Sequence, residues 1–174
     1  MDVLIDKRMP NARLERIRDV FVFCSLTGLA FTDADHLRRE HISRDDDGTM
    51  WIRKPREKTA VLSRIPLLPQ PLALLKKYEN DSELVRTGKL LPVPSNQKMN
   101  SYLKELADIC HIDKNLTTHV ARHSFACLAV EYGMPIDILA KILGHTNVNM
   151  TRHYAKFSEN NISREMQKLA IQLS

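Results

Sequence analysis

The sequence predicts a mainly α domain with one small three-stranded antiparallel β-sheet, an α+β fold, and three observations support this class. Apolar residues recur at three- and four-residue spacing over most of the 174 residues, as in helices that pack one face on a core. Between residues 41 and 65 the pattern changes to three brief strand-like runs separated by polar turns. In the last third of the chain, glycine and proline divide the sequence into short helices.

The first helix is predicted over residues 11–26, because apolar side chains repeat there at 3-4-3 spacing. These side chains are Leu14, Ile17, Phe21 and Cys24. Gly28 is a natural stop just beyond the helix, since glycine accepts the left-handed conformation that ends many helices. A second, short helix capped by Thr32 is expected to follow.

The sheet is predicted from three short runs of strand-forming residues, which cover residues 41–43, 49–52 and 60–65. The turn DDDG at 45–48 joins the first two runs, and the basic turn KPREK at 54–58 joins the second and third. Because no helix separates the runs, we expect an antiparallel meander rather than a βαβ unit.

The rest of the chain is predicted to be helical around one extended connection at residues 88–97. Helices are expected at 71–78, 97–110, 118–132, 135–144, 147–154 and 158–174. Neither side of the connection would bury a good core alone, so we expect a single domain over residues 1–174.

The composition permits a nucleic-acid partner without requiring one, since 26 Lys and Arg against 21 Asp and Glu leave a net charge of only +5. No apolar run approaches the ~20 residues of a membrane span, and the N-terminal residues do not form a signal peptide. The three cysteines are far apart and form no CxxC pair, so neither a disulfide framework nor a cysteine zinc site is expected. We expect a cytoplasmic protein in which Cys24 and Cys127 are buried.

A first candidate motif, T-x-H-x-x-R-H, covers residues 117–123. His119 and Arg122 are three residues apart and therefore share one helix face. His119 also lies in the first helical turn, where the positive end of the helix dipole favours an anion such as phosphate. A single histidine of this kind is more often a satisfied structural residue, so the motif gains weight only from its neighbours.

The second motif, LGHTNVNMTRHY, covers residues 143–154. Gly144 is expected to end a helix and present His145, and Tyr154 follows nine residues later. A tyrosine, two histidines and an arginine suit phosphoryl transfer. The phenol is the nucleophile, the guanidinium grips the phosphate oxygens, and the imidazoles exchange protons. No metal is needed where arginine neutralises the developing charge.

The basic turn at 54–58 supplies a third candidate, Lys58. It is either a solvated hairpin tip or a lysine that enters a DNA groove as a general acid, and the turn alone does not distinguish these. Other basic residues are candidate DNA contacts. They are Arg53, Lys54, Arg56, Lys141 and Arg152.

In order and spacing, these motifs resemble the catalytic domain of the tyrosine recombinases, or phage-type integrases. The set comprises HxxRH at 119–123, LGH at 143–145, Tyr154, and a lysine on an upstream hairpin. The short connections and the stretch TGLAFTDADHL are most similar to integrases of conjugative and mobilisable elements of the Bacteroides group.

The resemblance implies the tyrosine recombinase catalytic fold and a metal- and cofactor-free reaction. Tyr154 would attack the scissile phosphate and form a 3′-phosphotyrosyl link. Arg122 would hold the phosphate, His119 and His145 would assist binding and proton transfer, and Lys58 would protonate the leaving 5′ oxygen. The implied partner is double-stranded DNA at attachment or recombination sites, with four protomers in the synaptic complex.

The sequence departs from the family where a TGLR-like motif is expected, because residues 27–30 read TGLA and the arginine is replaced by Ala30. Arg18 lies at about 40° from Leu14 on the first helix, at the edge of the apolar face, and is our candidate substitute. The alternatives are that Arg18 only extends from the core edge to solvent, or that Ala30 marks a weakened enzyme.

The resemblance further implies an N-terminal DNA-binding domain that this chain lacks, and a last helix over 158–174 that packs on its own domain or docks on a neighbouring protomer.

Three rival functions remain. A non-catalytic DNA-binding or regulatory module would not need Tyr154. A zinc hydrolase is disfavoured because Val120 occupies the position of the HExxH glutamate. A type IB topoisomerase would use similar chemistry.

Overall fold

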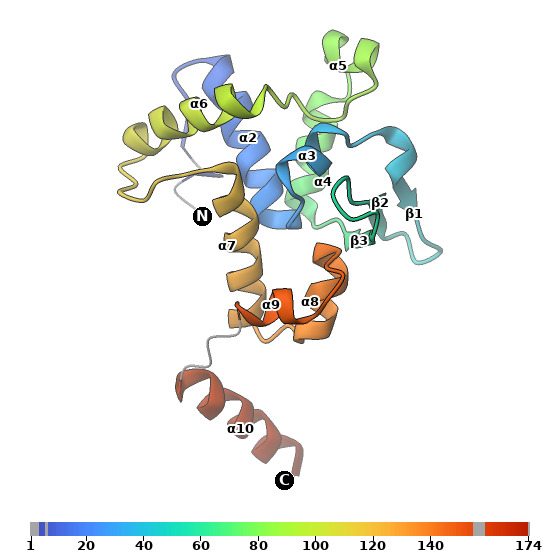
Figure 1. The fold of residues 1–174 in the computed structure, drawn as a ribbon, viewed down its shortest axis with the longest axis vertical. Helices are drawn as coiled ribbons and strands as arrows, with labels where there is room; N and C mark the ends of the chain where they lie inside the picture. Colours follow the sequence, from blue (N-terminus) through green and yellow to red (C-terminus); the bar gives the residue numbers. More distant parts are fainter. Residues whose placement is uncertain (1–3, 6, 155–158, 174) are drawn as a thin grey trace.

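The computed structural model describes residues 4–5, 7–154 and 159–173. Its described elements are mainly helical and include a three-stranded sheet of order β1-β2-β3, antiparallel throughout, which confirms the predicted class. Figure 1 shows α7 (Thr118–Glu131) beside α2 (Ala12–Thr27), with α8 (Ile136–Leu143) and α9 (Asn149–Arg152) near the far end of α7. None of the described helices is long and apolar enough to cross a bilayer.

Helix α2 is the central element of the core and begins and ends as predicted. The Asn11 side chain accepts from the Leu14 backbone N–H at 2.9 Å, and Gly28 ends the helix at φ +70°. The predicted apolar stripe is buried, but so are residues on other faces, such as Val20 and Phe23. The helix is buried on several sides because α4 (Pro69–Tyr78), α6 (Asn96–Ile109) and α7 all pack against it.

The sheet consists of β1 (Ile42–Arg44), β2 (Met50–Pro55) and β3 (Leu62–Pro66). Ile52 pairs with Ile42 on one side and Ile65 on the other, and Ile52 and Ile65 are buried in the core. Strand β2 runs three residues further than predicted. The turn to β3 therefore lies at 57–59, followed by Ala60 at φ +55°.

Three local predictions are wrong. Helix α3 (Phe31–Asp35) begins after Ala30 without a side-chain cap, so Thr32 lies inside it. Helix α5 (Ser82–Thr87), which the Asp81 side chain caps, was not predicted. Cys127 is exposed rather than buried, because it lies on the solvent side of α7. The segment Arg39–His41 forms one 3₁₀ turn before β1.

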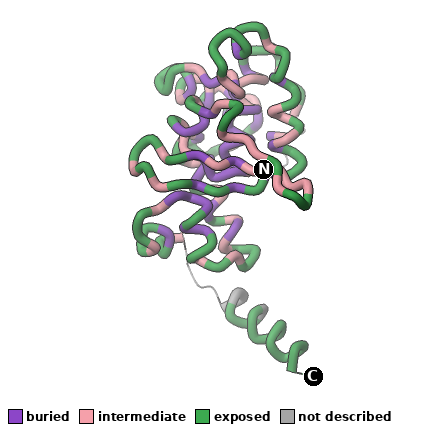
Figure 2. Tube along the Cα trace, turned by 90° about the vertical axis from the view of Figure 1, so that its right-hand side faces the viewer, coloured by how far each residue is buried: buried purple, intermediate pink, exposed green. Residues whose placement is uncertain are grey.

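The C-terminal helices build a second, smaller core that supports the candidate site. The Thr117 side chain caps α7, and Gly144 ends α8 at φ +60°. The buried members of this core are Ala126, Ala129, Leu139 and Leu143, and Tyr154 packs against them. Helix α10 (Glu159–Leu173) extends away from the body, and its described side chains are exposed (Figure 2). Ser158, where this helix was predicted to begin, lies outside the described residues.

Candidate active site

Arg122 is buried in the middle of α7, with 6% of its surface exposed. Its Nη1 donates to the Gly28 carbonyl and its Nη2 to the Leu143 carbonyl, both at 2.6 Å. These partners are neutral, and no carboxylate among the described residues bonds this guanidinium. Burial, followed by the nearby Arg56 charge, lowers the pKa of Arg122 to about 10, so the side chain stays charged at pH 7. Its positive charge is therefore held between the C-terminal ends of α2 and α8.

His145 directly follows the glycine that ends α8, and its ring is fixed by a hydrogen bond at each of its two nitrogens. Arg122 Nη2 lies 3.1 Å from Nε2, and Thr151 Oγ1 lies 2.8 Å from Nδ1. Because an arginine can only donate, Nε2 accepts and Nδ1 carries the proton, which it donates to Thr151. Burial, then Arg122 and Arg56, lower the pKa of His145 to about 4. The ring is therefore neutral at pH 7.

Tyr154 lies within this group because α9 returns the chain toward α7. Its ring centroid is 5.1 Å from that of His123, at an interplanar angle of 59°. Its phenol is close enough to Arg122 to raise the pKa of that guanidinium. Within the described part of the chain, the Tyr154 hydroxyl has no hydrogen-bond partner. The phenol is therefore not engaged in a structural hydrogen bond.

Thr151 is a site residue that the sequence analysis did not identify. It is fully buried, accepts from His145, and its backbone carbonyl accepts from the Tyr154 N–H at 3.0 Å. This residue therefore connects the histidine to the tyrosine. Its pattern in the sequence, a threonine in a short polar helix, carries no distinguishing signal.

Arg56, which was predicted as a DNA contact, is mostly buried, with 11% of its side chain exposed, and is paired with a buried carboxylate. Its Nε donates to Asp33 Oδ2 at 3.2 Å, and the Glu57 backbone N–H donates to Asp33 Oδ1 at 2.8 Å. Asp33 is 1% exposed and lies on α3, so this carboxylate anchors the β2–β3 turn to α3.

The structure corrects the prediction that Lys54 contacts DNA, because this side chain is buried. It shares the inward face of β2 with Ile52, because strand side chains alternate, and it is only 4% exposed. Its Nζ donates to Glu57 Oε1 at 2.6 Å, and this bond, together with the lysine charge, lowers the pKa of Glu57. His36 Nδ1 lies 3.3 Å from the same oxygen. Lys54 therefore stabilises the turn from inside.

Two further predicted catalytic side chains, Lys58 and His119, are exposed. Lys58 lies on the turn two residues after Arg56, and His119 lies one helical turn before Arg122. No hydrogen bond or ion pair joins either side chain to another described residue. Both are therefore beside the site and free to meet a ligand.

Arg18 is not brought to the site, which corrects its prediction as the substitute arginine. Its guanidinium donates to the Lys7 carbonyl at 2.7 Å and to Asp19 Oδ1 at 2.7 and 2.9 Å. It precedes Gly28 by ten residues on the same helix, which corresponds to about 15 Å of rise. Arg18 borders the core, as its position on the helix predicted. Its guanidinium binds the N-terminal segment through the Lys7 carbonyl.

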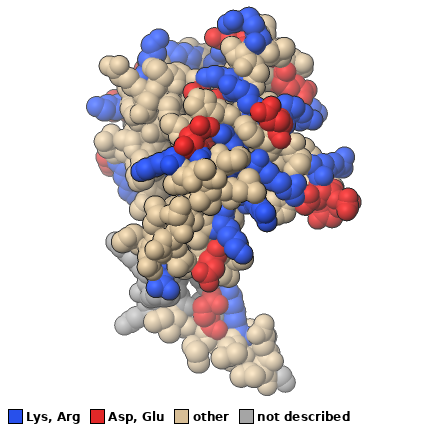
Figure 3. Space-filling model, turned by 45° about the vertical axis from the view of Figure 1, so that its right-hand side comes forward, with Lys and Arg blue, Asp and Glu red and all other residues tan. Residues whose placement is uncertain are grey.

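The other predicted DNA contacts lie on the surface. Arg53 bonds Asp45 at 2.6 Å and lies over the Trp51 ring, while Lys141 and Arg152 are exposed on α8 and α9. Figure 3 shows Lys and Arg side chains interspersed with acidic ones over this face.

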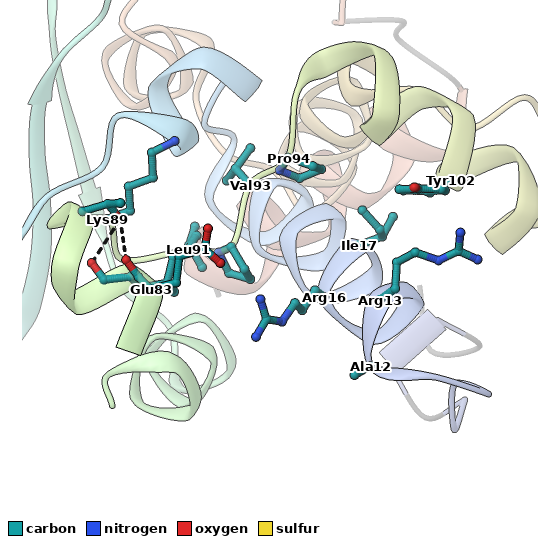
Figure 4. A pocket seen from close by; sticks show the side chains of 13 residues that line it. Ala12, Arg13, Arg16, Ile17, Glu83, Lys89, Leu91, Val93, Pro94 and Tyr102 are labelled. Atoms are coloured by element: carbon teal, nitrogen blue, oxygen red, sulfur yellow. Dashed lines mark hydrogen bonds between the residues drawn. The ribbon is translucent and has the colours of Figure 1, made fainter. Parts of the chain in front are cut away.

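A separate hollow between α2 and the 88–95 connection is lined by Arg16, Lys89 and Tyr102 among others (Figure 4), and none of its lining residues belongs to the candidate site.

A family model described as the phage integrase family matches residues 4–161. A curated tyrosine recombinase of Agathobacter rectalis is 32% identical over 93 residues, which cover 48% of this chain and 29% of the relative. Tyrosine recombinase XerD of Halalkalibacterium halodurans is 38% identical over 82 residues, which cover 47% of this chain and 26% of the relative. The chain thus spans less than a third of these relatives.

Solved structures share the fold. XerH recombinase bound to palindromic difH, in a post-cleavage complex, matches with a TM-score of 0.74 at 19% identity, over 95% of this chain and 48% of XerH. The Tn1549 transposon integrase bound to transposon right end DNA matches with a TM-score of 0.69 at 17% identity, over 97% of this chain and 63% of that one. At these identities the likeness establishes the shared architecture.

Proposed function

The chain belongs to the phage integrase family of tyrosine recombinases, and we propose that its site cleaves and rejoins DNA at specific sites through a 3′-phosphotyrosyl intermediate on Tyr154. The observation that carries the proposal is the grouping of a buried, charged Arg122, a neutral His145 and an unengaged Tyr154 hydroxyl. A buried cation without a carboxylate partner favours an anion, and a phosphodiester is the anion that a phenol can attack.

In the proposed reaction, Tyr154 Oη forms a bond to phosphorus and the bond from phosphorus to the 5′ oxygen breaks. Arg122 holds the non-bridging oxygens as charge develops on them. His119 and His145 assist phosphate binding and take part in proton transfer, and Lys58 gives its proton to the leaving 5′ oxygen. A 5′-hydroxyl of a second duplex then attacks the phosphotyrosyl bond. One phosphoester replaces another, so the reaction needs no energy-supplying nucleotide, metal or cofactor.

The proposed partner is double-stranded DNA at recombination sites, with a tetramer of protomers on it, in the cytoplasm of a bacterium. The XerH and Tn1549 integrase structures are described as complexes with their DNA sites, which supports this class of partner. We extend the proposal to an integrase of a Bacteroides-type mobile element, for which the support is the sequence stretch TGLAFTDADHL at residues 27–37.

A covalent-capture experiment tests the proposal without knowledge of the target sequence. The protein is incubated with a pool of nicked duplexes of randomised sequence, in which cleavage next to the nick releases a short 5′-hydroxyl fragment and prevents rejoining. Denatured protein is then isolated, and its attached DNA is sequenced. We expect the unmodified protein to capture a defined set of sequences and the Tyr154→Phe variant to capture none.

One observation favours a second candidate function, a DNA-binding module of the same fold that does not cleave. The observation is Ala30, which stands where the family has a phosphate-binding arginine. Failure of the unmodified protein to capture any DNA, together with salt-dependent non-covalent binding, would favour this module over the recombinase.

A further inference from the structure

Arg56 lies against the loop that surrounds the Arg122 guanidinium. A Cβ atom placed on Gly144 would come within 2.6 Å of Arg56 Cδ and 2.9 Å of its Cγ, so the arginine stem packs directly on this glycine. The two residues that flank Gly144 both accept hydrogen bonds from Arg122, Leu143 through its carbonyl and His145 through Nε2. The two guanidinium groups therefore belong to one site, although they come from the β2–β3 turn and from α7.

Asp33 holds Arg56 in a way that leaves its binding end available. The carboxylate accepts from Nε, the donor nearest the chain, and its other oxygen is occupied by the Glu57 backbone N–H. Within the described residues, no hydrogen bond uses the terminal nitrogens Nη1 and Nη2 of Arg56. These nitrogens are the two donors that grip a phosphate in a fork.

The charge balance of the site favours an anion. Arg56 and Arg122 contribute two positive charges, and Asp33 is the buried carboxylate beside them. The Arg56 charge lowers the pKa of both Arg122 and His145, which means that the site resists a further proton and would be stabilised by a negative charge.

We propose that Arg56 supplies the second phosphate-binding guanidinium of the site and so replaces the arginine that is absent at Ala30. The proposal deepens the proposed function and rests on it. Asp33 follows Ala30 by three residues, and its carboxylate is paired with an arginine from the β2–β3 turn instead of one from its own segment. Arg56 contacts the scissile phosphate and acts as a catalytic residue.

The test uses Arg56→Gln, because the glutamine amide nitrogen occupies the position of arginine Nε and can keep the bond to Asp33 while the charge and both terminal donors are lost. The matched control is Arg86→Gln, which removes the same charge from an exposed position at the end of α5. Thermal unfolding of both variants establishes that they are folded.

The first measurement is a titration with inorganic phosphate at constant ionic strength. Binding is monitored by NMR of the histidine side chains. We expect Arg56→Gln to raise the dissociation constant about tenfold and Arg86→Gln to leave it unchanged. Equal phosphate affinity of Arg56→Gln and the unmodified protein would overturn the proposal.

The second measurement is the rate of covalent capture on the nicked pool. Arg56→Gln should be slowed about 100-fold or more, while Arg86→Gln keeps the rate of the unmodified protein. Capture by Arg56→Gln at the full rate would overturn the role of Arg56 and leave the recombinase function intact. Absence of capture by the unmodified protein, with phosphate binding still dependent on Arg56, would instead overturn the recombinase function and retain the anion site.

Discussion

His145 is neutral at pH 7 because its ring is partly buried beside two guanidinium groups, which lower its pKa to about 4. A neutral ring can accept a hydrogen bond from Arg122 and donate one to Thr151, which a protonated ring could not do. The network therefore selects both the charge state and the tautomer of the histidine before any ligand binds.

This pKa predicts a loss of stability in acid. The unfolded chain binds a proton at His145 near pH 6.5 and the folded chain only near pH 4, so stability falls as the pH drops through this range. Urea unfolding at pH 7 and pH 5 should show a larger loss for the unmodified protein than for His145→Gln, by about 1 kcal/mol after allowance for partial solvent exposure of the ring.

Any contribution of His41, whose pKa is also lowered, is common to both proteins and cancels in the comparison. An equal loss of stability in the two proteins between these pH values would contradict the assignment of a neutral, low-pKa His145.

Sequence spacing predicted Arg122, His145 and Tyr154 as one group, and the structure brings them together. Their grouping was predictable because the two motifs lie on consecutive helices joined by short, glycine-marked turns. Arg56 was predicted as a DNA contact but not as a catalytic residue, and Thr151 was not predicted at all. Arg56 reaches the site through a pairing with Asp33, 23 residues away in the sequence, and no local pattern reports such a contact.

At the scale of elements, the close approach of the β2–β3 turn to the end of α8 is the feature that builds the site. Gly144 permits it in two ways, since it adopts φ +60° and leaves space for Arg56 and for Ser63 Oγ, which would lie 2.5 Å from an added Cβ. Glycine at this position is therefore required by packing as well as by backbone conformation.

Gly144→Ala tests this close approach, and Gly133→Ala is its matched control. Gly133 also has a positive φ, of +84°, but an added Cβ would meet its nearest atoms at an ordinary 3.5 Å. Both variants should lose about 1 kcal/mol or more of unfolding free energy from backbone strain. Only Gly144→Ala should displace Arg56 and slow covalent capture, by about tenfold or more. Equal capture rates in the two variants would show that the position of Arg56 does not depend on this contact.

Errors in the predicted elements have physical causes at the same scale. Strand β2 was placed at 49–52 because a basic KPREK segment is typical of a turn. The strand instead continues to Pro55, because residues 53–55 pair with β3, and the Lys54 side chain points inward and pairs with Glu57. The apolar stripe predicted for α2 was too narrow because the helices α4, α6 and α7 pack against α2 on several sides, which an amphipathic pattern does not anticipate. The helix ends marked by Gly28 and Gly144 were predicted well, because positive φ is a local requirement.

At the scale of the whole molecule, α10 carries apolar side chains that its own domain does not cover. Ile162, Met166, Leu169, Ile171 and Leu173 are all exposed. An exposed apolar stripe on a helix that extends from the body is typical of an interaction surface. We propose that this helix docks on a neighbouring protomer in the DNA-bound assembly.

Met166→Glu tests the docking, with Gln167→Glu as the control that adds the same charge next to it. Met166→Glu should weaken self-association on DNA about tenfold or more, measured by analytical ultracentrifugation of the protein with a recombination-site duplex, because a charge on the apolar stripe must be desolvated on docking. Capture on isolated nicked duplexes should stay unchanged in both variants. Unaltered assembly of Met166→Glu would contradict docking through α10.

The central claim, that Tyr154 becomes covalently joined to the 3′ phosphate of DNA, is tested most directly by mapping the captured adduct. After protease and nuclease digestion, mass spectrometry identifies the modified peptide, and end-labelled duplexes identify the joined DNA end. The account predicts a nucleotide on Tyr154 alone, attached through a 3′ phosphate, with a free 5′-hydroxyl on the released fragment. A nucleotide on any other residue, or one attached through a 5′ phosphate, would contradict it.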